Sequence, residues 1–253
     1  MNPLLQEILT SGSLTDENGN KTPLHSAISI EEVNFISEMI ASHHLSRAVE
    51  IGCAMGISSL AIADALGKVK DGAHYILDPN QRSQWNNAGI NNLKRAGFQN
   101  FTLIEDYSEF ALPEMVKKGV RVDFGFIDGW HTFDHTLLDF FYINRMLDVN
   151  GIIVIDDVHM DAVSKAIRYI SNYPAYEYVA KVKNDELTTK RKLFASGTKV
   201  LSGLKYLTGD KISKELLSPK LLKSDHELNL DCTMIAFRKI AEDKREWNWY
   251  ESF

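Results

Sequence analysis

The stretch VEIGCAMGIS, residues 49–58, carries two glycines between an apolar run and a helix-like segment. Gly52 and Gly56 let the backbone turn sharply and approach a ligand closely. The dinucleotide fingerprint G-x-G-x-x-G needs a further glycine where this chain has Ala54. Glu50, two residues before the first glycine, would repel a pyrophosphate but can pair with an ammonium group. The stretch therefore favours a zwitterionic or cationic ligand over a dinucleotide, with a plain packing turn as the alternative.

On both sides of this turn, apolar runs alternate with segments of helical periodicity. The pattern predicts strands at 47–52, 73–78, 101–105, 122–128 and 151–157, and two closing strands at 176–182 and 231–239. It predicts helices at 30–43, 58–67, 84–97, 108–119, 135–147 and 161–173, after a short N-terminal helix and a loop at 11–22. This alternation is typical of an α/β fold, a doubly wound, Rossmann-like sheet that is mostly parallel.

The chain of 253 residues is expected to form a single domain. We expect an N-terminal helical cap (1–45), a core (46–182), an insertion (183–230), and a last strand and tail (231–253). The insertion is basic: between Lys181 and Lys223 there are eleven Lys and Arg and four acidic residues. Its pattern predicts two amphipathic helices. They would form a lid over the site, a surface that contacts a partner or membrane, or a solvated arm of a homo-oligomer.

Composition excludes several classes of protein. The formal net charge of -6 gives no electrostatic case for a nucleic-acid partner. Two cysteines, Cys53 and Cys232, do not make a disulfide framework. The N-terminus lacks the pattern of a signal peptide, and no apolar run is long enough for a transmembrane segment. We therefore expect a cytoplasmic location.

Acidic residues follow the next two strands as well. In open α/β sheets, ligands bind outside the carboxyl ends of the strands. Asp78 ends the second strand, where an acid commonly accepts ribose hydroxyls. Asp106, Tyr107 and Ser108 end the third strand, where an aromatic side chain and polar groups can hold an adenine ring. An Asp at such a position can also simply cap the next turn.

The motifs VEIGCAMGISSLAIADAL, ILDPN, LIEDYSEFALP and FIDGWHTFDHTLLDFFYINRMLDVNGIIVIDDV together resemble the class I S-adenosylmethionine (SAM)-dependent methyltransferases. The nearest resemblance is to metal-dependent small-molecule O-methyltransferases, both the catechol type and the macrolide-sugar type. It covers about residues 25–182 and the last strand near 232–239. It implies a seven-stranded sheet whose last strand is antiparallel.

The resemblance also implies a cofactor site. The methionine end of SAM would lie at the glycine turn, the ribose at Asp78 and the adenine at the Asp106–Ser108 segment. His25 and Ser26, before the first long helix, are further candidates for reaching over the cofactor. The cofactor-binding residues that we expect are Glu50, Gly52, Cys53, Gly56, Ser58, Asp78, Asp106, Tyr107, Ser108 and Asp128.

Three carboxylates at neighbouring strand ends predict a metal. Asp128 ends the fourth strand, and Asp156 and Asp157 end the fifth. Converging carboxylates repel one another unless a cation lies between them, and oxygen ligands suit Mg²⁺. The resemblance places a divalent metal on these positions, where it binds two neighbouring substrate hydroxyls. The alternative is that Asp128 contacts only the cofactor while the Asp pair caps a turn.

His131 lies three residues after Asp128 in the motif DGWH. An imidazole can take a hydroxyl proton near neutral pH, so His131 and Asp128 are the expected catalytic residues. Some metal-dependent sugar O-methyltransferases carry a general base in this place. A loop histidine packed on Trp130 is the alternative, and His135 and His159 are expected to be structural or surface residues.

The expected function is therefore SAM-dependent O-methylation of a small hydroxylated, sugar-like or polyol-like acceptor, assisted by a divalent metal. A metal-independent methyltransferase of the same fold is one alternative. A non-catalytic SAM-binding interaction protein is another. A nicotinamide oxidoreductase is disfavoured by Glu50 and by the missing middle glycine.

Overall fold

The computed structural model describes residues 1–15, 20–67, 72–184, 225–251 and 253. Its strands are β1 (Ser13–Thr15), β2 (Lys21–Pro23), β3 (Arg47–Ile51), β4 (Ala73–Leu77), β5 (Phe101–Ile104), β6 (Val122–Ile127), β7 (Leu147–Ile155), β8 (Tyr176–Lys183) and β9 (Cys232–Lys239). Its helices are α1 (Pro3–Ser11), α2 (Ile30–Ser42), α3 (Ile57–Leu66), α4 (Ala88–Arg95), α5 (Ser108–Lys117), α6 (Phe133–Met146) and α7 (Asp161–Ile170).

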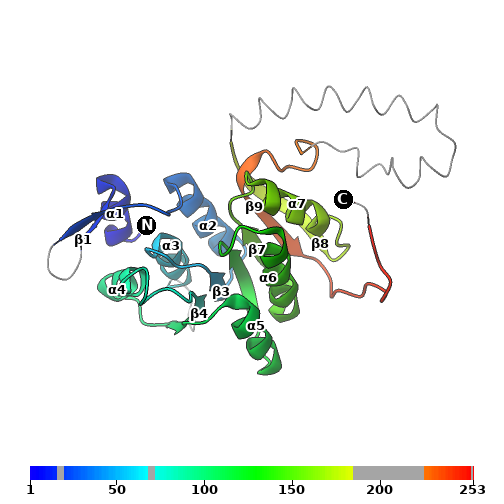
Figure 1. Cartoon of the computed structure of the whole chain (residues 1–253), viewed down its shortest axis with the longest axis horizontal. Helices are drawn as coiled ribbons and strands as arrows, with labels where there is room; N and C mark the ends of the chain where they lie inside the picture. The colour runs from blue at the N-terminus through cyan, green and yellow to red at the C-terminus, as the bar shows by residue number, and fades with distance from the viewer. Residues whose placement is uncertain (16–19, 68–71, 185–224, 252) are drawn as a thin grey trace.

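Seven strands form one sheet in the order β5-β4-β3-β6-β7-β9-β8 (Figure 1). The strands from β5 to β7 are parallel, and β9 runs antiparallel to both of its neighbours. The direction in which strands are added reverses at β3, because β6 pairs with β3 rather than with β5. The switch point therefore lies between β3 and β6. This confirms the predicted doubly wound fold with an antiparallel last strand, and it puts a switch point beside the glycine turn.

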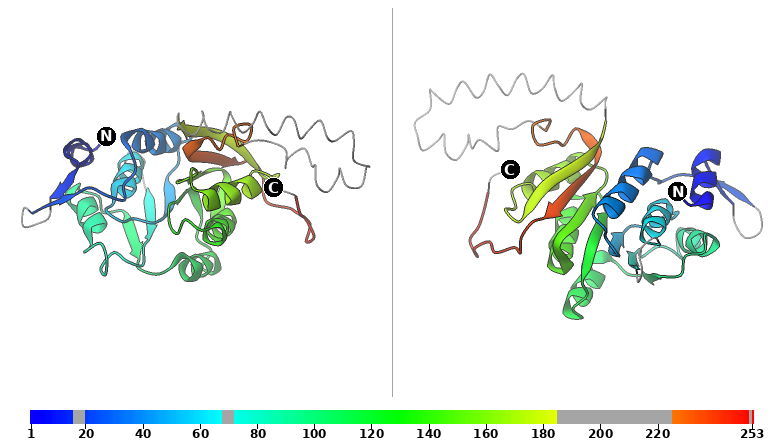
Figure 2. Two further views of the ribbon diagram at one scale, coloured as in Figure 1. Left: turned by 45° about the horizontal axis from the view of Figure 1, so that its top comes forward. Right: turned by 180° about the vertical axis from the view of Figure 1, so that it is seen from behind.

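Helices cover both faces of the sheet, so strand residues alternate between two cores (Figure 2). In β3, Ala48 packs on the side of α1 to α4, whereas Val49 packs on the side of α5 to α7. In β7, Val154 likewise packs on the side of α1 to α4 and Ile155 on the side of α5 to α7. Burial on both faces explains why these strands read as continuous apolar runs in the sequence.

Two local predictions are wrong. The predicted loop at 11–22 instead contains β1 and β2, which pair antiparallel as a separate small sheet. The helix predicted to start at residue 84 starts at Ala88. Asn86 and Asn87 just before it have φ of 49° and 57°, which is the left-handed region that asparagine tolerates better than most residues. The chain there forms a turn, which brings the start of α4 close to the glycine turn.

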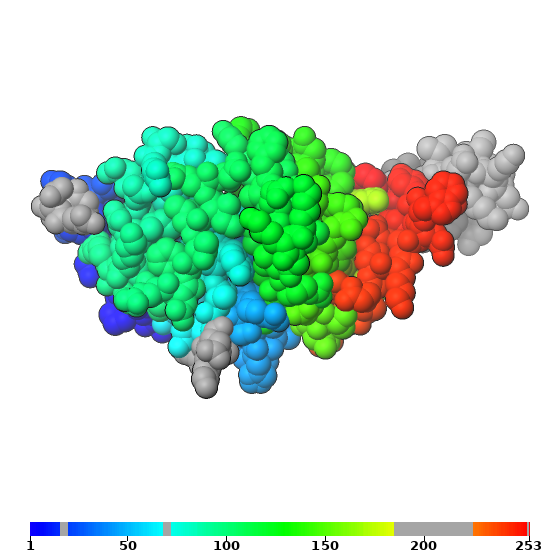
Figure 3. All heavy atoms as spheres, turned by 90° about the horizontal axis from the view of Figure 1, so that it is seen from below, coloured from blue at the N-terminus to red at the C-terminus, as the bar shows by residue number. Residues whose placement is uncertain are grey.

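The C-terminal residues pack back onto α6 and α7. Trp249 contacts the rings of Tyr169 and Tyr173, and Asn144 donates a hydrogen bond to Asp243. Figure 3 shows this red segment along the green part of the molecule. Most of the predicted basic insertion, with both of its expected helices, lies outside the described residues. Among the described helices, none has the length and apolar character needed to cross a membrane. Cys53 and Cys232 are both buried free thiols.

Candidate functional site

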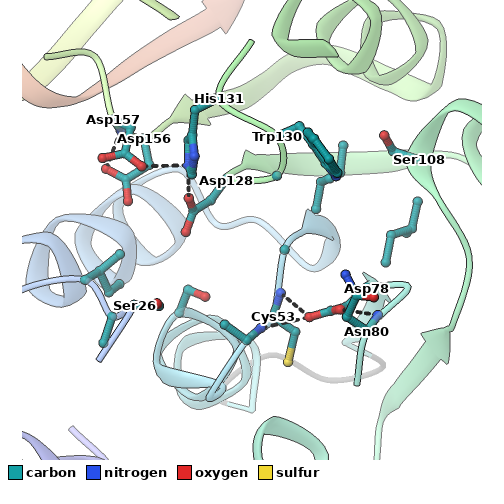
Figure 4. A pocket seen from close by; sticks show the side chains of 18 of the residues that line it. Ser26, Cys53, Asp78, Asn80, Ser108, Asp128, Trp130, His131, Asp156 and Asp157 are labelled. Carbon is teal, nitrogen blue, oxygen red and sulfur yellow. Dashed lines mark hydrogen bonds and ion pairs between the residues drawn. The ribbon is translucent and has the colours of Figure 1, made fainter. Parts of the chain in front are cut away.

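One cavity of about 510 Å³ lies at the carboxyl ends of the strands. Its wall is built from the segment before α2, the turns after β3 and β4, the start of α5, and the loops after β6 and β7 (Figure 4). It lies where the sheet order reverses, the position at which open α/β sheets bind ligands. Most of the residues singled out in the sequence line this cavity: Ser26, Gly52, Cys53, Ser58, Asp78, Tyr107, Ser108, Asp128, His131, Asp156, Asp157 and His159.

The glycine turn depends on glycine at both ends. Gly52 and Gly56 have φ of 89° and 84°, and a β-carbon on Gly56 would lie 2.6 Å from the α-carbon of Gly89. The turn therefore packs backbone against backbone at the start of α4. Between the glycines, Ala54 also has a positive φ, of 45°, so this short segment holds several residues in the left-handed region. The arrangement exposes the amino end of α3 to the cavity, where a ligand's negative group is favoured.

Asp78 holds this turn from the end of β4. Its Oδ2 accepts hydrogen bonds from the backbone amides of Cys53 (3.1 Å) and Ala54 (2.8 Å) and from Nε2 of Gln81 (2.8 Å). Its Oδ1 accepts from the amide of Asn80. The side chain lines the cavity but is only 4% exposed. Its position suits the predicted ribose contact, and its hydrogen bonds add a structural role that the sequence did not show.

Glu50 points into the protein rather than into the cavity. It is fully buried, and its two carboxylate oxygens accept hydrogen bonds from the hydroxyls of Ser58 (2.5 Å) and Ser59 (2.7 Å). The ring Nε2 of His74 lies 2.9 Å from Oε2. Glu50 is not among the residues that line the cavity, whereas Ser58 is. In this arrangement Glu50 reaches the cavity through Ser58.

The predicted adenine segment divides in two. Tyr107 and Ser108 line the cavity, whereas Asp106 does not; its Oδ1 accepts a hydrogen bond from the amide of Tyr107. Trp85, which the sequence analysis did not single out, also lines the cavity, and its ring lies 5.8 Å from that of His25. The sequence predicts Trp85 inside a helix that starts at residue 84, so it gave no signal for an aromatic wall.

Asp128, His131 and Asp157 converge at the other side of the cavity (Figure 4). Nε2 of His131 lies 3.3 Å from Oδ1 of Asp128 and 2.7 Å from Oδ2 of Asp157. Hydrogen bonds between neighbouring strand ends bring these residues together. The amide of Asp128 donates to the carbonyl of Ile51, and the amide of Asp156 donates to the carbonyl of Ile127. One metal-ligating atom from each residue of the cluster lies within 4.8 Å of the others.

The cluster shifts the ionisation of all three groups. Hydrogen bonds to Asp128 and then Asp157 raise the pKa of His131 to about 10. Removal from water raises the pKa of Asp128 to about 6, against the opposing effect of His131. Burial also acts to raise the pKa of Asp157, but contact with His131 outweighs it, and the pKa is lowered. At neutral pH this arrangement is an imidazolium held between two carboxylates.

Asp156 lies next to the cluster but is not part of it. Its Oδ1 accepts a hydrogen bond from the amide of Asp157, and the side chain is 8% exposed. Burial, then the charges of Asp128 and Glu32, raise its pKa well above the ordinary value. Glu32 was not predicted; it caps α2 through Ser29 and also lines the cavity. In the sequence, Ser29 and Glu32 form an S-x-x-E pattern that is typical of a helix start and gives no signal for a cavity.

Two of the remaining histidines differ in their distance from the cluster. His135 stacks on Trp130, with ring centroids 5.7 Å apart, and the hydroxyl of Thr132 accepts a hydrogen bond from its amide at the start of α6. His159 lines the cavity, and its Nδ1 lies 3.6 Å from Oδ1 of Asp157. His159 is therefore close enough to influence the cluster, whereas the sequence predicts a structural or surface residue.

Comparison with known families gives one match: residues 49–158 match a family described as a methyltransferase domain. No curated protein matches the chain. The matched range begins in β3, includes the glycine turn, and ends just after the Asp156–Asp157 pair. It therefore covers both sides of the cavity.

Solved structures of methyltransferases share the fold. An O-methyltransferase from Bacillus cereus in complex with SAH is 16% identical, with a TM-score of 0.60 over 74% of this chain and 87% of that one. TomG, an O-methyltransferase of Streptomyces achromogenes involved in tomaymycin synthesis and solved with SAM, is 18% identical, with a TM-score of 0.55 over 72% and 84%. The SAH-bound methyltransferase PaMTH1 of Podospora anserina is 18% identical, with a TM-score of 0.56 over 71% and 83%.

Proposed function

Residues 49–158 match a methyltransferase domain, and from this similarity we propose that the chain is a class I SAM-dependent methyltransferase that methylates a hydroxyl group of a small acceptor. One observation carries the proposal: the glycine turn and the Asp128–His131–Asp157 cluster line the same cavity. A methyl donor on the turn would therefore face an acceptor at the cluster. Holding two reactants in this way can lower the barrier by roughly 7–11 kcal/mol.

We place the cofactor along the wall from the glycine turn to α5. The methionine end would lie against the turn and Ser58, the ribose beside Asp78, and the adenine beside Tyr107 and Ser108. Three features support this order. Gly52 and Ser58 both line the cavity, Asp78 lies at the end of the second core strand, and Tyr107 offers a ring that is 42% exposed.

We propose that Asp128, Asp156 and Asp157 hold a divalent metal, for which oxygen donors favour Mg²⁺. Asp128 and Asp157 fit such an ion, because one oxygen of each lies within 4.8 Å of the other. Asp156 lies outside that cluster and would join the ligand set only after its side chain turns toward it. When bound, a metal of this kind supplies positive charge that lowers the pKa of a substrate hydroxyl. Because His131 contacts the same carboxylates, it would have to share them or turn toward the acceptor.

His131 is our candidate for the general base. A cation bound by Asp128 and Asp157 would offset the negative charge that raises the pKa of His131, and the neutral imidazole Nε2 would then take the proton from the acceptor hydroxyl as the oxygen attacks the methyl carbon. The new C–O bond forms while the C–S bond of the sulfonium breaks, and its electron pair stays on sulfur, which leaves S-adenosylhomocysteine (SAH). The neighbouring Asp128 and Asp157 would stabilise the imidazolium that results.

A sugar or other polyol is our preferred acceptor. Trp130, which is 59% exposed beside His131, offers a flat ring at the mouth of the cavity, and such rings suit the apolar face of a sugar. The motif DGWH supports the same choice through its resemblance to sugar O-methyltransferases.

One observation favours a metal-independent reaction. His131 already neutralises the two carboxylates at ion-pair distance, so this arrangement needs no metal to keep Asp128 and Asp157 together. In that case Asp128 and Asp157 would hold the charged His131 in place, and the acceptor hydroxyl would bind beside this cluster.

The proposal is tested with SAM and a panel of sugars, polyols and catechols, with SAH formation as the readout. Parallel reactions with EDTA-treated protein, with and without added Mg²⁺, separate the metal-dependent from the metal-independent reaction. Calorimetry with SAH provides the reference for cofactor binding. SAH binding without turnover of any acceptor would favour a non-catalytic binding protein, and absence of SAH binding would overturn the proposed function.

A further inference from the structure

Beneath the glycine turn lies a polar cluster made of Glu50, Ser58, Ser59 and His74. Glu50 has no exposed surface and His74 is 2% exposed. A charge removed from water this completely is costly unless it is paired and hydrogen-bonded. Ser58 and Ser59 supply the hydrogen bonds, at 2.5 and 2.7 Å. Within the described residues, His74 is the one group at ion-pair distance that can carry the compensating charge.

The geometry of His74 suits this task. Its Nε2 lies 2.9 Å from Oε2 of Glu50, as an ion-pair contact rather than an aligned hydrogen bond. The contact follows from the sheet, since β3 and β4 pair with Ala48 opposite His74. Within the described residues no hydrogen bond holds the ring, because both Nδ1 and Nε2 are buried without a hydrogen-bond partner. Glu50 is therefore the main polar contact of His74.

His74 itself lies away from the cofactor. It lines a separate cavity of about 320 Å³ and is not among the residues of the first cavity. Glu50 lies between His74 and the first cavity. Its Oε2 contacts His74, and its Oε1 accepts a hydrogen bond from Ser58, which lines the first cavity. Among the described residues, the polar contacts that link His74 to the first cavity therefore run through the Glu50 carboxylate.

We propose that His74 is a positioning residue for SAM: by pairing with Glu50 it fixes the carboxylate that aligns Ser58 and the glycine turn against the cofactor. The inference rests on the proposed function, because it places the cofactor in the first cavity. It adds a residue outside that cavity on which cofactor affinity depends.

The test measures SAH affinity by calorimetry for the wild-type chain, His74→Gln and His74→Leu. Glutamine keeps an N–H donor for Glu50, whereas leucine keeps only the bulk. We expect the Kd for SAH to rise at least about tenfold in His74→Leu and at most about threefold in His74→Gln, since losing a partner of a buried charge costs more than changing it. His43→Leu, at the end of α2, is the matched control with unchanged affinity.

Steady-state kinetics distinguish positioning from general damage. His74→Leu should raise the KM for SAM while kcat at saturating SAM stays within about twofold, because the residue acts on binding and not on the reacting atoms. A double variant with Glu50→Gln should bind SAH little worse than Glu50→Gln alone, because the two residues act as a pair.

Each result decides a different point. If the wild-type chain does not bind SAH, the proposed function fails. If the wild type binds and His74→Leu binds equally well, or if Gln and Leu weaken binding alike, the role of His74 fails and the proposed function stands. Should His74→Leu not fold, the ring ¹⁵N signals of His74 in the wild type are followed instead; they should move on saturation with SAH, and unchanged signals overturn the inference.

Discussion

Gly52 and Asp128 touch through their backbones: a β-carbon placed on Gly52 would lie 2.0 Å from the carbonyl oxygen of Asp128. The amide of Asp128 also donates to the carbonyl of Ile51, so β3 and β6 are joined where both strands end. The glycine that opens the turn after β3 therefore also sets the position of the first residue of the carboxylate cluster. The two sides of the cavity share one backbone contact.

This contact predicts a strong effect of Gly52→Ala. The new methyl group would meet a backbone atom that cannot rotate away, and φ of 89° adds strain. Gly119→Ala is the matched control, since φ there is 71° and nothing lies within 4 Å. We expect Gly52→Ala to lose at least about 2 kcal/mol more unfolding free energy than the control, measured by urea denaturation. Equal losses would show that the chain relaxes around the contact.

The sequence predicts the sheet and much of the cavity because both follow from local rules. Apolar runs mark strands buried on two faces, and parallel strands bring their carboxyl ends to one edge. Asp78, Asp128 and Asp157 each end a strand, so their meeting in one cavity needs no knowledge of side-chain packing.

The partners of Glu50 could not be predicted in the same way. The contact with His74 depends on the register of β3 against β4, which the apolar pattern does not specify when both faces are buried. Glu32 enters the cavity from a helix cap, and Trp85 from a turn that looks helical in sequence. Such contacts join segments far apart in the chain, where local patterns carry no information.

Asp139 on α6 should make stability depend on pH. It is 1% exposed, and burial raises its pKa to about 7. The folded protein therefore holds this proton more tightly than the unfolded chain does. Stability is greatest below the ordinary pKa of an Asp and falls as pH rises toward 7. Raising a pKa by one on folding corresponds to about 1.4 kcal/mol, so the loss of unfolding free energy reaches at most about 4 kcal/mol.

Asp139→Asn removes this dependence. We expect the variant to gain stability over the wild type at pH 8 and to gain much less, or none, at pH 4, measured by chemical denaturation at each pH. Asp134→Asn, on the same helix but 81% exposed, is the control; the Thr132 hydroxyl lowers the pKa of Asp134, so this variant should not gain stability at pH 8. A gain that is the same at both pH values would show that the Asp139 carboxyl does not ionise as its burial indicates.

A divalent metal should stabilise the protein through Asp157. A ligand that binds only the folded state adds stability by mass action, about 2.7 kcal/mol at 100 times its Kd. We expect excess Mg²⁺ or Mn²⁺ to raise the melting temperature of EDTA-treated protein, and Asp157→Asn to abolish the rise. Asp134→Asn should retain it, since that side chain is far more exposed and lies outside the cluster. No rise in the wild type would favour the metal-independent reaction.

His131→Ala separates a base from a metal ligand. If His131 takes the acceptor proton, kcat should fall about 10²–10⁴-fold, while the Kd for SAH and the metal-induced rise in melting temperature stay close to wild type. If Nε2 instead ligates the metal together with Asp128 and Asp157, the rise in melting temperature is lost as well. His135→Ala is the control, because His135 stacks on Trp130 without contacting either carboxylate of the cluster. Near-normal turnover by His131→Ala would rule out the base, and the cluster would then act through its carboxylates alone.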